Sequence, residues 1–393
     1  MLLSFCITKQ GKSHELNHVP CQDFSYCKRI VDKSKHEWII SAVADGVGSC
    51  SNSHYGSKTA AVCAVDFLAD NLREELIIDD DLVLSVLHKA YQEALDSVEA
   101  KADELQMPVI TFDTTLTVTV FSEDSMYFGQ SGDGGIVVLY EDGSYEMITK
   151  RQKGEEASSV FPLRSTDCWV FGKANKRVAS LALMTDGVLD AVVSNEALDN
   201  RVYFPFFRPV LAAKASEKDD EILLKEYMEK VLSTEEYRER VTDDISYAAA
   251  LNTDITSKLK EIEFDAEEWE QKTIEFDKRN KQYLNRQAQL YVQEHSKNNS
   301  GMGISEKHVR KKDVDLSRQK QQDFVSKQKN ESENVMKCFV KLIEGSAEMG
   351  IQVGRGVNKA LQRMEMSPGA MERQEKLTTK SILRDNSDMK RDS

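Results

Sequence analysis

Five aspartates of this chain stand where an apolar run ends or a turn begins, a placement that suits the binding of a cation. They are Asp23, Asp45, Asp133, Asp186 and Asp243. An isolated Asp-Gly pair usually marks a turn, because aspartate caps the backbone and glycine tolerates positive φ. Asp45 and Asp186, however, each follow a run of strand character, which leaves a carboxylate at a strand end. Several such strand ends side by side would form an acidic pocket.

The chemistry that such a pocket supports is that of hard divalent cations. Mg²⁺ and Mn²⁺ prefer carboxylate and carbonyl oxygens together with water. The sequence holds no histidine or cysteine set with zinc-ligand spacing, so a zinc site is disfavoured. Two divalent ions about 3.5–4 Å apart can hold a bridging water, lower its pKa and stabilise an in-line phosphoryl displacement. That reaction needs no nucleophilic side chain, and neither a P-loop nor a Gly-x-Ser-x-Gly elbow is present.

Charge and cysteine content narrow the class of protein. Of the net charge of −14, residues 1–255 contribute −18 and residues 256–393 contribute +4. An acidic front part attracts divalent cations and repels phosphodiester backbones, so we expect no nucleic-acid partner. The seven cysteines are an odd number without CxxC spacing, which favours reduced thiols. No apolar run approaches the ~20 residues of a membrane span, and we expect a cytoplasmic protein without a membrane partner.

The elements that would position the aspartates follow from hydrophobic periodicity. Clusters of β-branched and aromatic residues predict strands at residues 2–8, 38–44, 115–121, 125–128, 136–140, 180–184 and 245–251. Apolar residues at helical spacing predict a helix pair at 56–76 and 80–105, and shorter helices at 219–232 and 234–240. Strands interrupted by paired helices indicate an α+β sandwich with helices outside stacked sheets.

Beyond residue 251 the composition becomes polar, and we place a domain boundary near residues 252–257. Residues 1–255 form the folded domain, residues 256–297 a long amphipathic helix, and residues 298–393 a charged, largely disordered tail with short amphipathic helices. An apolar stripe recurs every seven residues at Ile262, Trp269, Phe276, Tyr283 and Leu290. A single helix that lays this stripe on the domain or on a partner, and a self-associating coiled coil, are both compatible with the spacing.

Short motifs in a fixed order along the chain resemble the metal-dependent protein phosphatase family, type 2C, particularly its bacterial branch. They are Gly11-x-Ser13-His14, Pro20-Cys21-Gln22-Asp23, Ala44-Asp45-Gly46-Val47-Gly48, Gly56-Ser57, Asp113-Thr114-Thr115-Leu116, Gly132-Asp133, Thr185-Asp186-Gly187 and Asp243-Asp244-Ile245-Ser246. The resemblance covers residues 1–251. It implies a four-layer α-β-β-α sandwich with a metal pair in the cleft at one edge of the two central sheets.

The resemblance also implies roles for individual residues. Asp45 resembles the bridging carboxylate, and the carbonyl of Gly46 resembles a ligand of one metal. Asp186 and Asp243 resemble ligands of the other metal. Asp23 resembles a ligand that acts through metal-bound water. The implied cofactors are two Mn²⁺ or Mg²⁺ ions, with a weaker third ion in some members.

Three positions depart from the family's pattern. Asp133 matches a position that either supports the third metal or is structural, but it precedes Gly134 where serine is usual. His14 stands where many members carry an arginine that grips the substrate phosphate, and imidazole offers fewer donors than guanidinium. Gln22 replaces a common glutamate and removes a negative charge from the metal surroundings.

The function that the resemblance implies is hydrolysis of phosphoserine or phosphothreonine on a protein, with a metal-bridged water or hydroxide as nucleophile. Asp45, Asp23 and His14 are the expected catalytic residues. A cognate kinase or another protein is the expected partner of residues 256–393. One alternative is a catalytically weak or inactive phosphatase-fold module that binds such a partner. Another is a two-metal nuclease, which the acidic front part disfavours.

Between Asp186 and Asp243 the sequence also carries a Phe/Pro-rich stretch that includes Phe204, Phe206 and Phe207. Two interpretations stay open for it. The aromatic rings either pack in the core or form an exposed flap that biases substrate choice.

Overall fold

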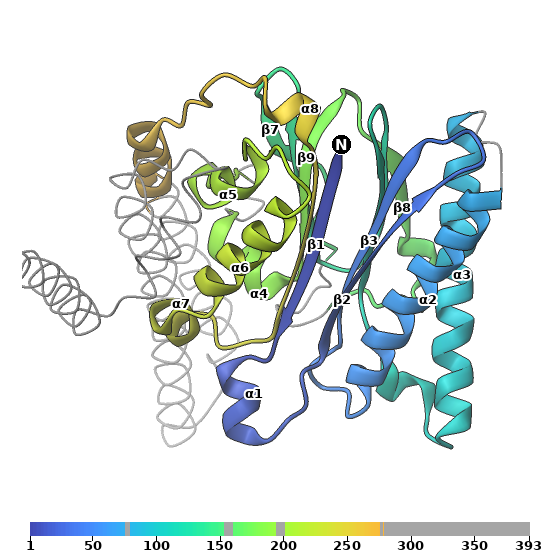
Figure 1. Cartoon of the computed structure of the whole chain (residues 1–393). Helices are drawn as coiled ribbons and strands as arrows, with labels where there is room; N and C mark the ends of the chain where they lie inside the picture. Colours follow the sequence, from blue (N-terminus) through green and yellow to red (C-terminus); the bar gives the residue numbers. More distant parts are fainter. Residues whose placement is uncertain (75–78, 153–159, 194–200, 276–277, 279–393) are drawn as a thin grey trace, which may run out of the picture.

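Two antiparallel sheets stack face to face at the centre of the computed structural model (Figure 1). The structure describes residues 1–74, 79–152, 160–193, 201–275 and 278. The first sheet has the strand order β1 (Leu2–Lys9), β10 (Ile245–Asn252), β9 (Val178–Met184), β6 (Gly135–Tyr140) and β7 (Tyr145–Met147). The second has the order β2 (Asp23–Val31), β3 (Glu37–Asp45), β4 (Leu116–Ser122), β5 (Met126–Ser131) and β8 (Val170–Lys173).

Helices cover the outer face of each sheet (Figure 1). The pair α2 (Ser53–Glu74) and α3 (Asp80–Glu104) packs on the second sheet, as the apolar periodicity predicted. On the first sheet lie α4 (Asp186–Val192), α5 (Phe204–Leu211) and α6 (Asp220–Leu232). The short helices are α1 (Lys12–Asn17), η1 (Val109–Phe112), η2 (Thr166–Cys168), α7 (Glu235–Arg240) and α8 (Thr253–Thr256).

Strand β3 is buried on both faces, which explains why its sequence is a nearly continuous apolar run. Ile39 and Val43 face the layer between the two sheets, whereas Ile40, Ala42 and Ala44 face α2 and α3. Successive strand residues point to opposite faces, so a strand buried on both sides reads as a continuous apolar run. Three apolar layers result, one between the sheets and one beneath each helical cover. The predicted four-layer α-β-β-α sandwich is therefore confirmed.

The Phe/Pro-rich stretch is a helix, which the sequence interpretation missed. Residues 204–211 form α5, with Pro205 in its first turn. Phe204, Phe206 and Phe207 are 0%, 3% and 0% exposed, and Phe204 stacks on Tyr145 with a ring-centroid distance of 4.2 Å. The packing interpretation is confirmed, and the exposed aromatic flap is wrong.

The chain beyond α8 continues across the outer face of the first sheet's helical layer. Ile262 is buried, and Arg208 of α5 donates a hydrogen bond to its carbonyl over 2.8 Å. Residues 266–275 are helical, so helix begins ten residues later than the predicted start at 256. Trp269 packs against Tyr203 with a ring-centroid distance of 5.5 Å.

The remaining stripe positions, Phe276, Tyr283 and Leu290, and the predicted tail at 298–393 lie outside the described residues. Among the helices that the structure describes, none is long and apolar enough to cross a membrane.

Candidate active site

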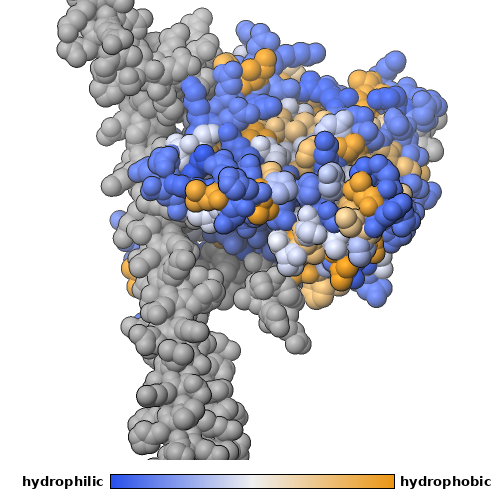
Figure 2. All heavy atoms as spheres, turned by 90° about the horizontal axis from the view of Figure 1, so that it is seen from below, coloured by the Kyte–Doolittle hydropathy of each residue, from blue (hydrophilic) through white to orange (hydrophobic). Residues whose placement is uncertain are grey.

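Three carboxylates from distant parts of the chain meet at one end of the sandwich. One oxygen each of Asp45, Asp133 and Asp186 lies within 4.8 Å of the other two. Asp45 ends β3 in the second sheet, and Asp186 begins α4 directly after β9 of the first sheet. Asp133 lies in the turn from β5 to β6, which crosses from the second sheet to the first. Figure 2 views the molecule from this end, at which α1 also lies, and hydrophilic residues dominate much of that face.

The backbone around Asp45 is held by two threonines that directly precede the neighbouring strand β4. Its N–H donates to Oγ1 of Thr115 over 2.9 Å. Its carbonyl accepts from Oγ1 of Thr114 over 2.9 Å and from the Thr115 N–H over 2.8 Å. The motif Asp113-Thr114-Thr115-Leu116 therefore fixes the strand end that carries the carboxylate, and does not itself supply a carboxylate to the group of three.

Asp23 is the register partner of Asp45 on the adjacent strand β2. It is 4% exposed, and its Oδ2 accepts a hydrogen bond from Oγ1 of Thr185 over 2.7 Å. Thr185 directly precedes Asp186, so this bond ties the two sheets together beside the carboxylates. Sequence reasoning missed Thr185, because the strand that carries its partner is more than 150 residues away in the chain.

The electrostatics of the group suit a divalent cation. Burial raises the pKa of Asp45 well above its usual range, and the charges of Asp23, Asp186, Asp133 and Asp243 raise it further. Burial likewise raises the pKa of Asp23, although the bond from Thr185 opposes this effect. Crowded carboxylates of this kind are costly alone and favourable around a cation. Their all-oxygen donor set fits Mn²⁺ or Mg²⁺.

The backbone of Gly46, the residue after Asp45, is tightly enclosed. Its N–H donates to the carbonyl of Gln22 over 3.0 Å. A Cβ at Gly46 would lie 2.7 Å from Cβ of Ser53 and 2.8 Å from the Gln22 carbonyl oxygen. Only glycine therefore fits this buried position next to Asp45.

Asp243 and Asp244 have different surroundings. Asp243 is exposed, lies outside the group of three, and accepts from the Asp244 N–H over 2.8 Å. Asp244 is 2% exposed and accepts from the Gly11 N–H over 2.7 Å and the Gln22 N–H over 2.5 Å. The sequence analysis gave a role to Asp243 alone. The acidic doublet before a predicted strand was the signal that could have revealed Asp244.

His14 and Gln22 are both tied to this framework. Nδ1 of His14 lies 2.8 Å from Oδ2 of Asp244, and the His14 side chain is 18% exposed. Nε2 of Gln22 donates to Oγ of Ser53 over 2.7 Å and to the carbonyl of Cys50 over 3.2 Å. The amide of Gln22 thus supports the loop after Asp45 through its N–H groups, which a glutamate in its place lacks.

Two glutamines order the turn that carries Asp133, and neither was singled out from the sequence. Nε2 of Gln130 donates to the carbonyls of Gly132 and Gly134, and Oε1 of Gln152 accepts from the Gly132 N–H over 2.7 Å. Gly132 has a φ of +101°, which favours glycine. A Cβ at Gly134 would lie 2.6 Å from Oγ1 of Thr117, which explains the departure from serine at this position.

A half-buried arginine next to the segment that holds the Asp133 turn was also missed. Arg151 has a side chain that is 9% exposed and forms an ion pair with Asp190. Asp190 lies one turn after Asp186 in α4, and Arg151 precedes Gln152, which holds the Asp133 turn. Arg151 therefore links α4 to the segment that holds the Asp133 turn.

Comparisons with known proteins agree with this architecture. A family model described as protein phosphatase 2C matches residues 10–233, more than half of the chain. Serine/threonine-protein phosphatase 3 of Escherichia coli (strain K12) is 29% identical over 252 residues, which cover 61% of this chain and 94% of that protein.

The comparison with solved structures found matches at low identity and low TM-score. The crystal structure of the serine/threonine phosphatase Stp1 from Staphylococcus aureus has a TM-score of 0.43 at 16% identity and covers 64% of this chain and 95% of its own. The catalytic domain of the serine threonine protein phosphatase PstP in complex with two manganese ions has a TM-score of 0.42 at 17% identity, and covers 64% of this chain and 97% of its own. From the family-model match, the chain belongs to the protein phosphatase 2C family of metal-dependent serine/threonine protein phosphatases.

Proposed function

We propose that this chain hydrolyses phosphoserine and phosphothreonine monoesters on proteins, with divalent cations at Asp45, Asp133 and Asp186. The observation that carries the proposal is the meeting of these three carboxylates within 4.8 Å. The family match and the relative named as a serine/threonine-protein phosphatase support the substrate class.

The residues that we assign to the cations all offer oxygen. Asp45 would bridge two Mn²⁺ or Mg²⁺ ions, with the Gly46 carbonyl on one ion and Asp186 and Asp243 on the other. Asp133 would contribute to a weaker third ion. Bound cations supply charge stabilisation of the phosphoryl oxygens and acidify the attacking water.

The remaining side chains would position the groups of the site and neutralise charge. The bond from Thr185 holds Asp23 in a fixed rotamer beside Asp45, from where it can orient water at the cation site. His14 would bind the substrate phosphate with the ring nitrogen that does not face Asp244. Arg151 keeps α4 and the Asp133 turn together through its ion pair with Asp190.

We also propose a protein partner for the segment after residue 255. A cognate kinase or another protein would bind residues 256–393, which carry a net charge of +4 against −18 for the domain. We place the protein in the cytoplasm, with a phosphoprotein as substrate.

Release of phosphate from a phosphothreonine peptide tests the proposal. Wild type should turn over with Mn²⁺ and lose activity with chelator, and Asp45→Asn should lose at least ~100-fold in turnover. Asp70→Asn, at a side chain 76% exposed on α2, is the matched control and should behave as wild type. If wild type binds Mn²⁺ but does not release phosphate, the chain would instead be a partner-binding module. Metal-dependent cleavage of nucleic acid would instead indicate a nuclease.

A further inference from the structure

The two edge strands β1 and β2 belong to different sheets, yet they run antiparallel beside each other (Figure 1). Oγ1 of Thr8 lies 2.8 Å from Oγ of Ser25. Two residues further along each strand, the sulfurs of Cys6 and Cys27 lie 3.5 Å apart. The side chains on the facing sides of β1 and β2 therefore pair in register, as they would across a hairpin.

A third rung completes this ladder. Both the Ser4 N–H and Nη2 of Arg29 donate to Oε2 of Glu221, over 2.9 Å and 2.5 Å. Because Glu221 of α6 joins the two strands beside the cysteines, the two sulfurs are held between fixed rungs on either side. The packing of β1 against β2 therefore sets the short distance between the two sulfurs.

The environment of the two thiols differs in a way that favours reaction between them. Cys27 donates its S–H to the sulfur of Cys6, which lowers the pKa of Cys6 to about 7 against the effect of burial. Ser25 and Lys225 lower it further, and the hydrogen bond to Cys6 together with burial raises the pKa of Cys27. The charge of Glu221 raises the pKa of Cys27, and the charge of Lys225 lowers it. Arg29 forms an ion pair with Glu221. The hydrogen bond therefore makes Cys6 the more acidic of the two thiols, and the thiolate is the nucleophilic form.

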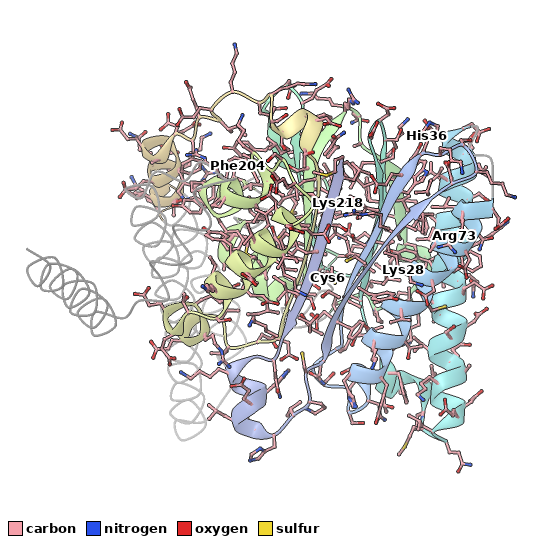
Figure 3. The ribbon with its side chains drawn as sticks, in the orientation of Figure 1. Cys6, Lys28, His36, Arg73, Phe204 and Lys218 are labelled. Atoms are coloured by element: carbon pink, nitrogen blue, oxygen red, sulfur yellow. The ribbon has the colours of Figure 1, made fainter. Side chains whose placement is uncertain are left out.

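Both cysteines are half-buried, so a small oxidant can reach them. Figure 3 labels Cys6 on β1, where that strand runs beside β2. Cys63 on α2 provides a contrast. Burial raises its pKa above the ordinary value, which disfavours its thiolate.

We propose that Cys6 and Cys27 are a peroxide-responsive pair that forms a disulfide between the two sheets. The thiolate of Cys6 attacks one oxygen of hydrogen peroxide, breaks the O–O bond and becomes a sulfenic acid as the first water leaves. The sulfur of Cys27 then attacks the sulfur of Cys6, and the second water leaves with the thiol proton. In sum, two thiols and one peroxide give one disulfide and two waters. The sulfurs must approach from 3.5 Å to about 2.05 Å, which side-chain rotation on adjacent strands can supply.

The crosslink would close a loop that carries part of the proposed active site. Residues 6–27 include α1, His14 and Asp23. A disulfide at the two ends of this segment restricts the unfolded chain and ties the segment to both sheets. Oxidation should therefore stabilise the domain. The inference does not depend on the proposed catalytic activity.

The full-length chain, treated with a small excess of hydrogen peroxide and then alkylated, tests the proposal by mass spectrometry. We expect a peptide pair joined through Cys6 and Cys27, and an increase in Tm of roughly 5–10 °C that dithiothreitol reverses. Cys6→Ser and Cys27→Ser should each abolish both effects. Cys63→Ser, at another half-buried thiol, should retain them.

Other results would overturn the proposal. They are sulfinic acid at Cys6 without a crosslink, a disulfide through Cys21 in wild type, or a crosslink that survives Cys27→Ser. If a serine variant fails to fold, alkylation of the reduced wild type near pH 7 decides the outcome. Cys6 should then react at least ~10-fold faster than the half-buried Cys63, because only a thiolate is nucleophilic, and equal rates would contradict the proposal.

Discussion

The carboxylate of Asp244 lies 2.8 Å from Nδ1 of His14, and this contact connects the start of β10 to the helix that follows β1. The same carboxylate accepts the backbone N–H groups of Gly11 and Gln22. Asp244 is thus the buried centre that fixes the segment before Asp23. An imidazole in place of the family's arginine still finds a carboxylate partner here, which orients its ring.

Asp244→Asn should destabilise the domain by about 2–3 kcal/mol, because the amide leaves one of the buried N–H groups without an acceptor. Urea unfolding in the presence of chelator measures this effect without interference from metal binding. Asp243→Asn is the matched control, since Asp243 is exposed and adjacent in sequence. Its effect on stability should stay within about 0.5 kcal/mol, and equal losses in the two variants would contradict the assignment.

Mn²⁺ should raise the Tm of the wild-type domain, because a ligand that binds only the folded state adds stability, about 2.7 kcal/mol at 100 times Kd. Asp186→Asn should reduce this shift and lower turnover at least ~100-fold. In chelator the same variant should be no less stable than wild type, since it removes a charge that repels Asp45. Calorimetry with and without Mn²⁺ checks both statements. An unchanged Mn²⁺ shift would remove Asp186 from the site.

Trp269→Ala should cost about 1.5–3 kcal/mol, because the ring packs against apolar and aromatic neighbours of the folded domain. Arg201 lies over the Trp269 ring at 4.8 Å from its centroid, and Tyr203 packs at 5.5 Å. Ile274→Ala on the same helix is the control, because Ile274 is 60% exposed. Urea midpoints that are equal for the two variants would show that the segment does not dock through Trp269.

Asp32 should make stability depend on pH below neutrality. Burial raises the pKa of Asp32, but the bonds from Nε1 of Trp38 and the His36 N–H outweigh it, and the net pKa is lowered. A group with a depressed pKa in the folded state stabilises above its unfolded pKa of about 3.9 and loses that contribution as pH falls through the folded value.

Asp32→Asn should therefore destabilise the domain by about 1–3 kcal/mol at pH 7, and the difference from wild type should shrink between pH 4 and pH 2. Urea unfolding over this range measures it, with the exposed Asp81→Asn as control. A difference that stays constant over the whole range would refute the role given to the carboxylate charge.

The central strands could be predicted from the sequence because they are buried on both faces. Strand β3 and the helix pair α2 and α3 carry apolar patterns that local periodicity alone reveals. Strand β2 was missed because it is an edge strand, and Lys28 and Arg29 interrupt its apolar residues. Helix α5 was missed because prolines argue against a helix, and it is the packing of its phenylalanines on the sheet that stabilises it.

The aspartates of the site could be predicted to the extent that each stands at a strand end. Asp45, Asp133 and Asp186 do meet, and the charge of Asp243 is near enough to raise the pKa of Asp45. The partners that hold them, such as Thr185 and Asp244, come from long-range pairing of strands, which no local pattern encodes. Which residues coordinate which ion stays a prediction.

The carboxylates that meet at the site are anchored in separate sheets, Asp45 in one and Asp186 beside the other. Their spacing therefore depends on how the inter-sheet layer around Phe121 and Leu181 seats the two halves against each other. Swapping a single large side chain for a smaller one in that layer, far from any cation, would let the halves slide by a fraction of an ångström. Substitutions that abolish the activity of this enzyme should accordingly occur as often in the layer between the two sheets as at the end that carries the three carboxylates.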